Sequence, residues 1–201
     1  MLKKIIKVIS LLLIIIIIMN YKNVLKKFFA TDYQEIVTTY AEKYNLDPYL
    51  VYSIIKVESG FDASAKSYKG AIGLMQIMPQ TGEYISNLLG EQGFTEGKLY
   101  DPEINIRYGT YYFSKLYKNY YEDLDMALAA YNGGEGNVRR WIREDSEGKK
   151  YIDMNDLMFE ETRKYLYKVK KNYLFYRYIY ENYGFNVINW RYSYVSVSNK
   201  V

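Results

Sequence analysis

The sequence lacks cysteine and histidine altogether in its 201 residues. Without cysteine the chain forms no disulfide bond. Without either residue it builds no Cys/His metal site, no Ser-His-Asp or Cys-His triad and no histidine acid–base catalyst. Proton chemistry near neutral pH is therefore left to carboxylates, lysine or tyrosine. The absence of cysteine is compatible with export, and the length fits one domain that buries a hydrophobic core.

Acidic residues are missing from residues 1–27, which carry six lysines: Lys3, Lys4, Lys7, Lys22, Lys26 and Lys27. Subtracting these six from the 27 basic residues leaves 21, against 23 acidic residues, so the rest of the chain has a net charge of −2. The overall charge of +4 is thus a property of the N-terminus. We expect no nucleic-acid-binding surface on the remainder.

The same N-terminus contains a long apolar run, Val8–Met19, which only Ser10 interrupts. Counted over 5–21 it reaches about 17 residues, the short end of a membrane span. Asn, Tyr and Lys follow at 20–22, where a cleaved signal peptide would have small residues. Residues 1–28 are therefore predicted to form an uncleaved membrane anchor, with the domain outside the cytoplasm. Export after signal cleavage is the alternative.

Apolar spacing and cap residues predict helices along the rest of the chain. No internal repeat is found, and the only candidate strand lies in the tail around 187–197. The sequence thus predicts an all-α domain over residues 29–184, followed by a C-terminal tail, 185–201. The expected helices are 33–45, 48–57, 80–89, a segment beginning at Asp101-Pro102, 125–131, 138–143 and 155–183.

The last of these helices carries an aromatic stripe at alternating four- and three-residue steps. Such a stripe is expected to pack on the core, although a tyrosine hydroxyl at its polar tip can still reach a cleft. The residues of the stripe are Tyr165, Val169, Tyr173, Tyr176, Tyr180 and Tyr183.

Glu58 stands at the end of the apolar helix that Asp47 and Pro48 begin. The negative end of the helix dipole and the apolar neighbours both disfavour ionisation of its carboxyl, so both should raise its pKa. A carboxyl that stays protonated near pH 6–7 is suited to protonating the leaving oxygen of a glycosidic bond. The alternative from this pattern alone is an exposed glutamate at a helix end.

Four blocks in series carry a resemblance to a known family. They are "ESGFDASAKSYKGAIGLMQIMP" (Glu58–Pro79), "DPEINIRYG" (Asp101–Gly109), "AYNGGEGNV" (Ala130–Val138) and "FEETRKYLYKV" (Phe159–Val169). Together, over about 46–173, they resemble the soluble lytic transglycosylase domain, which has a goose-lysozyme-like fold. The resemblance implies a lysozyme-like lytic transglycosylase domain behind a single N-terminal hydrophobic segment.

The resemblance implies that Glu58 is the sole catalytic acid/base and that the glycine-rich loop after it forms the floor and wall of a sugar cleft. Glycines would let the backbone pass close to the saccharide. The expected substrate-binding residues are Ser59, Ser67, Gln76, Met78, Tyr131, Asn132, Glu161 and Tyr165.

Several of these residues have a second interpretation. Ser67 could instead cap the loop, and Asn132 could form the C-cap of its helix. Gln76 offers a donor and an acceptor to the sugar, whereas Met75 is expected in the core. Glu161 is interpreted as structural, or as a hydrogen-bond acceptor on the cleft floor beside Tyr131.

The implied function is cleavage of peptidoglycan glycan strands at the β-1,4 bond between N-acetylmuramic acid and N-acetylglucosamine, with formation of 1,6-anhydromuramic acid and without metal or cofactor. One alternative is a hydrolase of the same bond. An inverting hydrolase would need a second carboxylate roughly 6.5–9.5 Å away, for which Asp62, Glu83, Asp101 and Glu161 are candidates. The other alternative is a catalytically silent glycan-binding protein at the cell surface.

Overall fold

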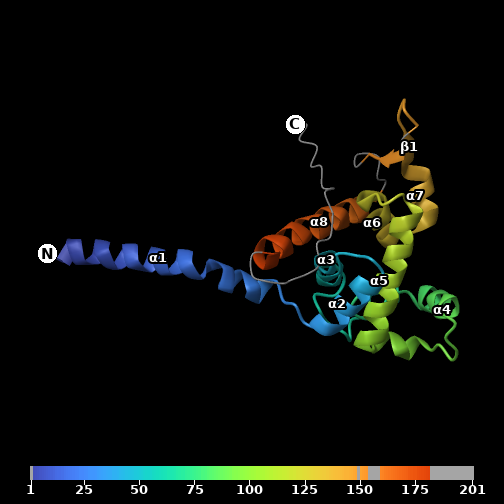
Figure 1. The fold of residues 1–201 in the computed structure, drawn as a ribbon, viewed down its shortest axis with the longest axis horizontal. Coiled ribbons are helices and arrows are strands. Elements are labelled where there is room, and N and C mark those ends of the chain that lie inside the picture. Colours follow the sequence, from blue (N-terminus) through green and yellow to red (C-terminus); the bar gives the residue numbers. More distant parts are fainter. Residues whose placement is uncertain (1, 149, 154–158, 182–201) are drawn as a thin grey trace.

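The computed structural model describes residues 2–148, 150–153 and 159–181. In these residues the regular secondary structure is almost entirely helical, as predicted, and α1 leads into the cluster formed by the other helices (Figure 1). The elements are α1 (Leu2–Phe28), α2 (Gln34–Lys43), α3 (Pro48–Glu58), α4 (Pro79–Leu88), the 3₁₀ helix η1 (Glu96–Tyr100), α5 (Pro102–Asn119), α6 (Leu124–Gly133), α7 (Glu135–Trp141), β1 (Ile142–Glu144), β2 (Lys150–Ile152) and α8 (Glu160–Tyr180).

Helix α3 forms the centre of the fold. The Asp47 side chain accepts a hydrogen bond from the backbone N–H of Tyr49 at 2.8 Å, and Pro48 occupies the first turn, as the cap pattern predicted. The first eight residues of α3 are all buried, and α8 is its main packing partner. This burial fixes the C-terminal end of α3, where Glu58 stands, firmly within the domain.

Helix α8 lays its tyrosine stripe on this core, which confirms the expectation for the part of the stripe that is described. Tyr165, Val169, Tyr173, Tyr176 and Tyr180 are all buried, whereas Tyr183 lies outside the described residues. The hydroxyl groups are largely used inside the domain: Tyr173 donates to Asp47 Oδ2 at 2.6 Å and Tyr176 to the carbonyl of Ala30 at 2.7 Å. Buried tyrosine in this helix therefore contributes both packing area and long-range hydrogen bonds.

The structure differs from the sequence prediction in three places. Between the helices expected at 80–89 and from Asp101 the structure contains the short helix η1, for which the sequence predicted no helix. The helix predicted over 138–143 begins earlier, at Glu135, and ends at Trp141. An antiparallel hairpin, β1–β2, follows it, with Ile142 opposite Ile152. The two strands have three residues each, too short to show an alternating pattern in the sequence. The predicted helix start at 155–158 and the tail 185–201, including its candidate strand, lie outside the described residues.

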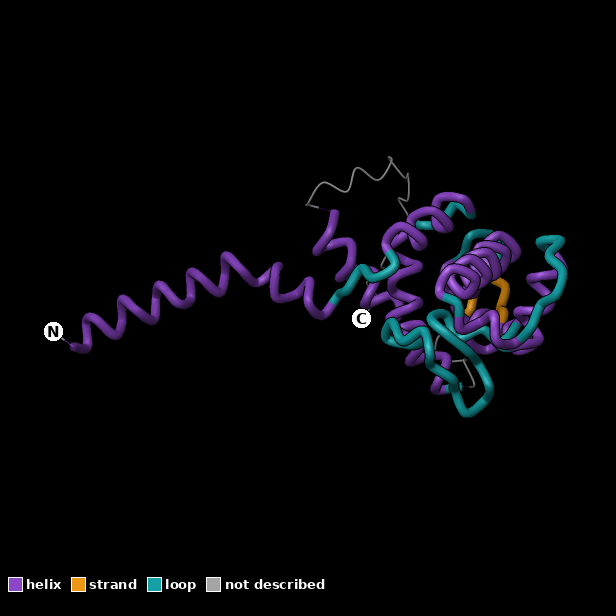
Figure 2. The backbone as a smooth tube through the Cα atoms, turned by 90° about the horizontal axis from the view of Figure 1, so that it is seen from below, coloured by secondary structure: helices purple, strands orange, loops and turns teal. Residues whose placement is uncertain are grey.

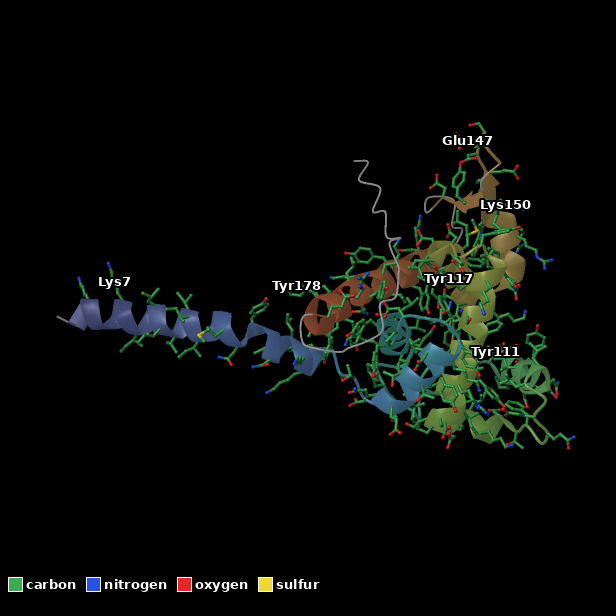
Figure 3. All side chains as sticks on the ribbon, in the orientation of Figure 1. Lys7, Tyr111, Tyr117, Glu147, Lys150 and Tyr178 are labelled. Carbon is green, nitrogen blue, oxygen red and sulfur yellow. The ribbon has the colours of Figure 1, made fainter. Side chains whose placement is uncertain are left out.

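Helix α1 extends away from the other elements (Figures 1 and 2). Most of its described apolar side chains are exposed, for example Ile17 by 66% and Leu11 by 58%, whereas Leu25 packs against the core. Within the described parts of the chain, no helix meets the length and hydropathy that a membrane span requires. At its C-terminal end α1 joins the domain directly, because the next residue, Phe29, is buried and its carbonyl accepts a 2.7 Å hydrogen bond from Tyr180. Tyr178, near this junction, is labelled in Figure 3.

Candidate active site

Glu58 is the last residue of α3, as predicted, and its side chain is half-buried. Burial raises the pKa of its carboxyl from 4.5 to about 7; the neighbouring Tyr165 hydroxyl opposes this rise and the negative charge of Glu161 adds to it. Near neutral pH the carboxyl therefore exchanges its proton readily, which is the property that general acid–base catalysis requires.

Two tyrosines enclose this carboxyl from two further helices, Tyr131 from α6 and Tyr165 from α8. Burial, and next the charge of Glu58, raise the pKa of both phenols well above 10, so both remain protonated and able to donate. Tyr131 donates to the carbonyl of Met75 at 2.8 Å. The Tyr165 hydroxyl lies beside the Glu58 carboxyl, but among the described residues it makes no hydrogen bond of regular geometry.

Asn105 of α5 holds the glycine-rich loop between α3 and α4 from the buried side of the domain. This buried side chain accepts from the N–H of Met75 at 2.7 Å and donates to the carbonyls of Ile72 at 2.9 Å and Leu99 at 2.7 Å. Gly73 adopts φ +78°, and a Cβ there would stand 2.3 Å from Asn105 Nδ2. Glycine is therefore required at this position by both conformation and space.

Ser59 and Met75 hold the same loop from its two ends. Ser59 follows Glu58 and donates to the carbonyl of Leu74 at 2.8 Å, so its hydroxyl is engaged within the protein. Met75 is fully buried, as expected, and fits against Gly109, where a Cβ would approach its sulfur to 2.5 Å. The loop is therefore irregular in conformation but well anchored.

Three further predicted residues lie on this loop, and two of them use polar groups inside it. Gln76 adopts φ +48° and its Nε2 donates to the carbonyl of Gly73 at 3.0 Å, so a donor that was expected to face the sugar is used by the loop. Ser67 Oγ accepts from the N–H of Ala71 at 3.0 Å, which confirms its alternative interpretation as a loop-capping residue. Met78 is half-buried immediately before α4.

Asn132 and Glu161 lie where the prediction needs correction. Asn132 stands inside the last turn of α6, and the C-cap is Gly134, so the interpretation of Asn132 as the cap is wrong. Glu161 was expected to be structural or part of the cleft floor. Its side chain is 69% exposed in the first turn of α8 and accepts from Lys69 Nζ at 3.2 Å. It is therefore exposed and held by an ion pair, and its role in substrate binding stays a prediction.

Sequence reasoning missed Asn105 and Lys69. Asn105 lies between Ile104 and Ile106, so a polar residue flanked by apolar ones at the start of a helix was the available signal. Lys69 offered no signal, because its partner lies 92 residues away in the sequence. Among the described residues, no group of three or more acidic side chains is arranged to hold a metal ion.

This helical domain thus has one half-buried glutamate with two tyrosines beside it and an anchored glycine-rich loop after it, an arrangement that belongs to a known family. The model of the Transglycosylase SLT domain family matches residues 35–154. The chain belongs to this family. The matched residues include Glu58, the glycine-rich loop after it and Tyr131, whereas the block Phe159–Val169 lies beyond them.

Particular relatives are soluble and membrane-bound lytic transglycosylases. The chain is 33% identical over 159 residues to the soluble lytic murein transglycosylase of Escherichia coli strain K12, which covers 77% of this chain and 24% of the relative. It is 33% identical over 169 residues to the membrane-bound lytic murein transglycosylase C of Edwardsiella ictaluri, covering 72% of this chain and 47% of the relative. The chain thus spans about a quarter to a half of these relatives.

Solved structures agree with the fold. The lytic transglycosylase Slt of Pseudomonas aeruginosa, solved as an inactive glutamate-to-glutamine mutant, has a TM-score of 0.70 at 28% identity, covering 77% of this chain and 25% of that protein. The 70 kDa soluble lytic transglycosylase of E. coli has a TM-score of 0.69 at 33% identity with the same coverage. A 70 kDa soluble lytic transglycosylase has also been solved in complex with bulgecin A, with a TM-score of 0.69 at 32% identity.

Proposed function

We propose that this chain is a lytic transglycosylase that cleaves peptidoglycan glycan strands at the β-1,4 bond between N-acetylmuramic acid and N-acetylglucosamine. The observation that carries the proposal is the Glu58 carboxyl, whose pKa is raised to about 7 by burial and which faces two tyrosines in a member of the SLT family. The lytic murein transglycosylases to which the chain is similar support the reaction class.

In the proposed reaction Glu58 acts twice. Its protonated carboxyl first gives its proton to the glycosidic oxygen as the bond from that oxygen to C1 of muramic acid breaks. The acetamido carbonyl of the substrate stabilises the electron-poor C1 centre, as in substrate-assisted glycosidases. The Glu58 carboxylate then takes the proton from the C6 hydroxyl as O6 bonds to C1. No water is consumed, the proton returns to Glu58, and the product ends in a 1,6-anhydro ring.

The hydrolase alternative receives less support from the four acids considered as second carboxylates. Asp62 is exposed and its pKa is lowered by its hydrogen bonds with Ser64; Asp101 accepts from the N–H of Ile104 as the N-cap of α5. Glu83 is exposed on α4. Of the four, only Glu161 contributes to the raised pKa of Glu58, and that carboxylate is paired with Lys69.

The test is to digest purified peptidoglycan and analyse the products by mass spectrometry. We expect muropeptides that end in 1,6-anhydromuramic acid, lighter by one water than the products of a hydrolase. Glu58→Gln should lower turnover by about 10³-fold, because an amide neither gives nor takes the proton. Reducing-end products would identify a hydrolase, and binding without products would identify a silent glycan-binding protein.

The same variant tests the environment of Glu58 without any substrate. Because burial raises the folded-state pKa, the neutral form stabilises the fold below pH 4.5, and that contribution is lost as pH rises to about 7. Glu58→Gln removes the buried charge and should be more stable than the wild type at pH 8 by about 1–3 kcal/mol. Denaturation at pH 4 should show no such difference. Equal stability at both pH values would contradict a raised pKa.

We further propose that residues 1–28 hold the domain at the outer side of a membrane. The support is the Val8–Met19 apolar run, the exposed apolar side chains of α1, and the membrane-bound relative. The lysines on both sides of the run suit anionic lipid headgroups. In fractionated cells the full chain should remain with membranes after a high-salt wash, and a chain lacking residues 1–28 should be released. A shortened soluble form of the full chain would instead indicate signal cleavage.

A further inference from the structure

One exposed ion pair, Lys69–Glu161, joins the glycine-rich loop to α8, and the proposed reaction does not use it. Lys69 stands at the tip of the glycine-rich loop, in a tight turn where the N–H of Gly70 donates to the carbonyl of Ser67 at 2.9 Å. Its Nζ reaches Glu161 Oε2 at 3.2 Å, in the first turn of α8. The pair therefore links the loop that begins just after Glu58 to the helix that carries Tyr165.

The position of Glu161 on α8 brings its charge close to the acid. Glu161 lies four residues before Tyr165, so the two side chains share one face of the helix. Tyr165 lies directly beside the Glu58 carboxyl, and the charge of Glu161 disfavours ionisation of Glu58. The groups that act on the Glu58 carboxyl are thus Tyr165 and Glu161, both from α8, while the charge of Glu58 in turn acts on Tyr131 of α6. The cation that pairs with Glu161 is Lys69, whose Nζ donates to Glu161 Oε2 at 3.2 Å.

We propose that Lys69 is a positioning residue of the active site, which holds the loop against α8 and compensates the negative charge that Glu161 presents to Glu58. The use of this arrangement in catalysis rests on the proposed function. The geometry does not depend on that function: Lys69 on the loop pairs with Glu161 on α8, and the charge of Glu161 acts on Glu58.

Removing either partner of the ion pair should shift the pKa of Glu58, and the two shifts should have opposite directions. Removing the carboxylate of Glu161 relieves the repulsion, so Glu58 ionises at lower pH. Removing the cation of Lys69 leaves Glu161 uncompensated, so Glu58 ionises at higher pH. In turnover, the protonated form of Glu58 is needed for the first step. The alkaline limb of the pH profile should therefore move down in Glu161→Gln and up in Lys69→Met.

The chain provides a matched control on the same loop. Lys66 pairs with Glu96 of η1 at 2.7 Å, and its side chain is 49% exposed, similar to the 56% of Lys69. Lys66→Met thus removes one positive charge and one exposed ion pair from the same loop, three residues away. Exposed pairs of this kind contribute little to stability, so neither lysine variant should lower Tm by more than about 2 °C. Any difference between them at Glu58 then arises from where the charge stands.

The experiment measures the Glu58 titration directly, by NMR of the carboxyl carbon in the substrate-free protein. We expect a shift of about half a pH unit downward for Glu161→Gln and a similar shift upward for Lys69→Met, the size expected for one charge acting through water over several ångströms. Both shifts should shrink in high salt. Lys69→Arg should restore the wild-type value, and Lys66→Met should leave it unchanged. A Lys69→Met titration equal to that of Lys66→Met would overturn the proposal.

The pH dependence of peptidoglycan cleavage is the second reading. We expect the alkaline limb to follow the NMR shifts in each variant, with the order Glu161→Gln, wild type, Lys69→Met from low to high pH. If the NMR shifts occur but no glycan is cleaved by any variant, the proposed function fails while the role of Lys69 at the acid stands. If cleavage occurs and the limbs coincide for all variants, Lys69 has no positioning role in catalysis.

Discussion

The hairpin β1–β2 and the loop between α3 and α4 both connect helices, but different interactions hold each of them in place. The hairpin β1–β2 uses regular antiparallel pairing, yet four of its six strand residues are exposed, and Glu147 and Lys150 lie at its outer end (Figure 3). The loop between α3 and α4 has little regular pairing, but Asn105 binds three of its surrounding backbone groups from the buried side. The loop beside Glu58 is thus held in place by buried polar contacts rather than by regular secondary structure.

The largest expected effect is that of Gly73→Ala, which places a Cβ at a position with φ +78° only 2.4 Å from the carbonyl oxygen of Leu99. Backbone must move to relieve this contact, so we expect a loss of about 4 kcal/mol in the free energy of unfolding. Urea denaturation measures it. Gly97→Ala is the control, since a Cβ there meets nothing within 4 Å. Equal losses in both variants would mean that the loop is not tightly held.

Asn105→Ala tests the same anchoring from the helix. It removes three hydrogen bonds in a buried place, including the one that the N–H of Met75 donates, so we expect a loss of about 3 kcal/mol. The carbonyl of Ile72 keeps its second hydrogen bond, from the N–H of Ile77 at 3.0 Å. Turnover on peptidoglycan should fall as well, because the loop beside Glu58 loses its support. The exposed Asn87 of α4 gives the matched control, whose change to Ala should alter stability by less than about 0.5 kcal/mol. A small effect at both positions would contradict the anchoring role.

Tyr131→Phe separates catalysis from folding at the boundary between loop and site. The variant keeps the ring and loses one hydrogen bond to the carbonyl of Met75, so stability should fall by about 1 kcal/mol. Turnover should fall further, by about 10- to 100-fold, since the hydroxyl lies in the surroundings of Glu58. The control is Tyr121→Phe, at a side chain that is 78% exposed. Parallel losses of turnover and stability would make Tyr131 purely structural.

The smallest effect is expected in the hairpin. Glu144→Ala changes an exposed residue of β1, and stability should remain within about 0.5 kcal/mol of the wild type with unchanged turnover. Thermal denaturation and the muropeptide assay check this. A loss comparable to that of Asn105→Ala would remove the contrast between the two regions.

The sequence was sufficient for the elements whose signals are local. The Asp47-Pro48 and Asp101-Pro102 caps predicted the starts of α3 and α5, because a cap acts within three residues. Glu58 was predicted correctly at the end of α3, with a raised pKa, because burial of that helix could be read from its apolar run. The hairpin was missed because three-residue strands are too short for a period to appear.

The remaining features of the site depend on contacts between distant segments. Gln76 adopts a positive φ and donates to the carbonyl of Gly73 within its own loop, and no pattern in the sequence predicts this conformation. The pairing of Lys69 with Glu161 joins residues 92 positions apart. Sequence patterns indicated which residues would gather at the site, but whether each faces the cleft, the loop or the solvent is decided by packing between helices.

The direct passage of α1 into the domain at Phe29 has a mechanical consequence. The residues that join α1 to the domain are fixed, because the carbonyls of Phe29 and Ala30 each accept a hydrogen bond from a tyrosine of α8. Helix α1 is therefore joined to the domain without a flexible linker, so the direction of α1 and the orientation of the domain depend on each other. If residues 1–28 anchor the domain as proposed, an anchored α1 would therefore set the orientation of Glu58 as well as its distance from the anchor.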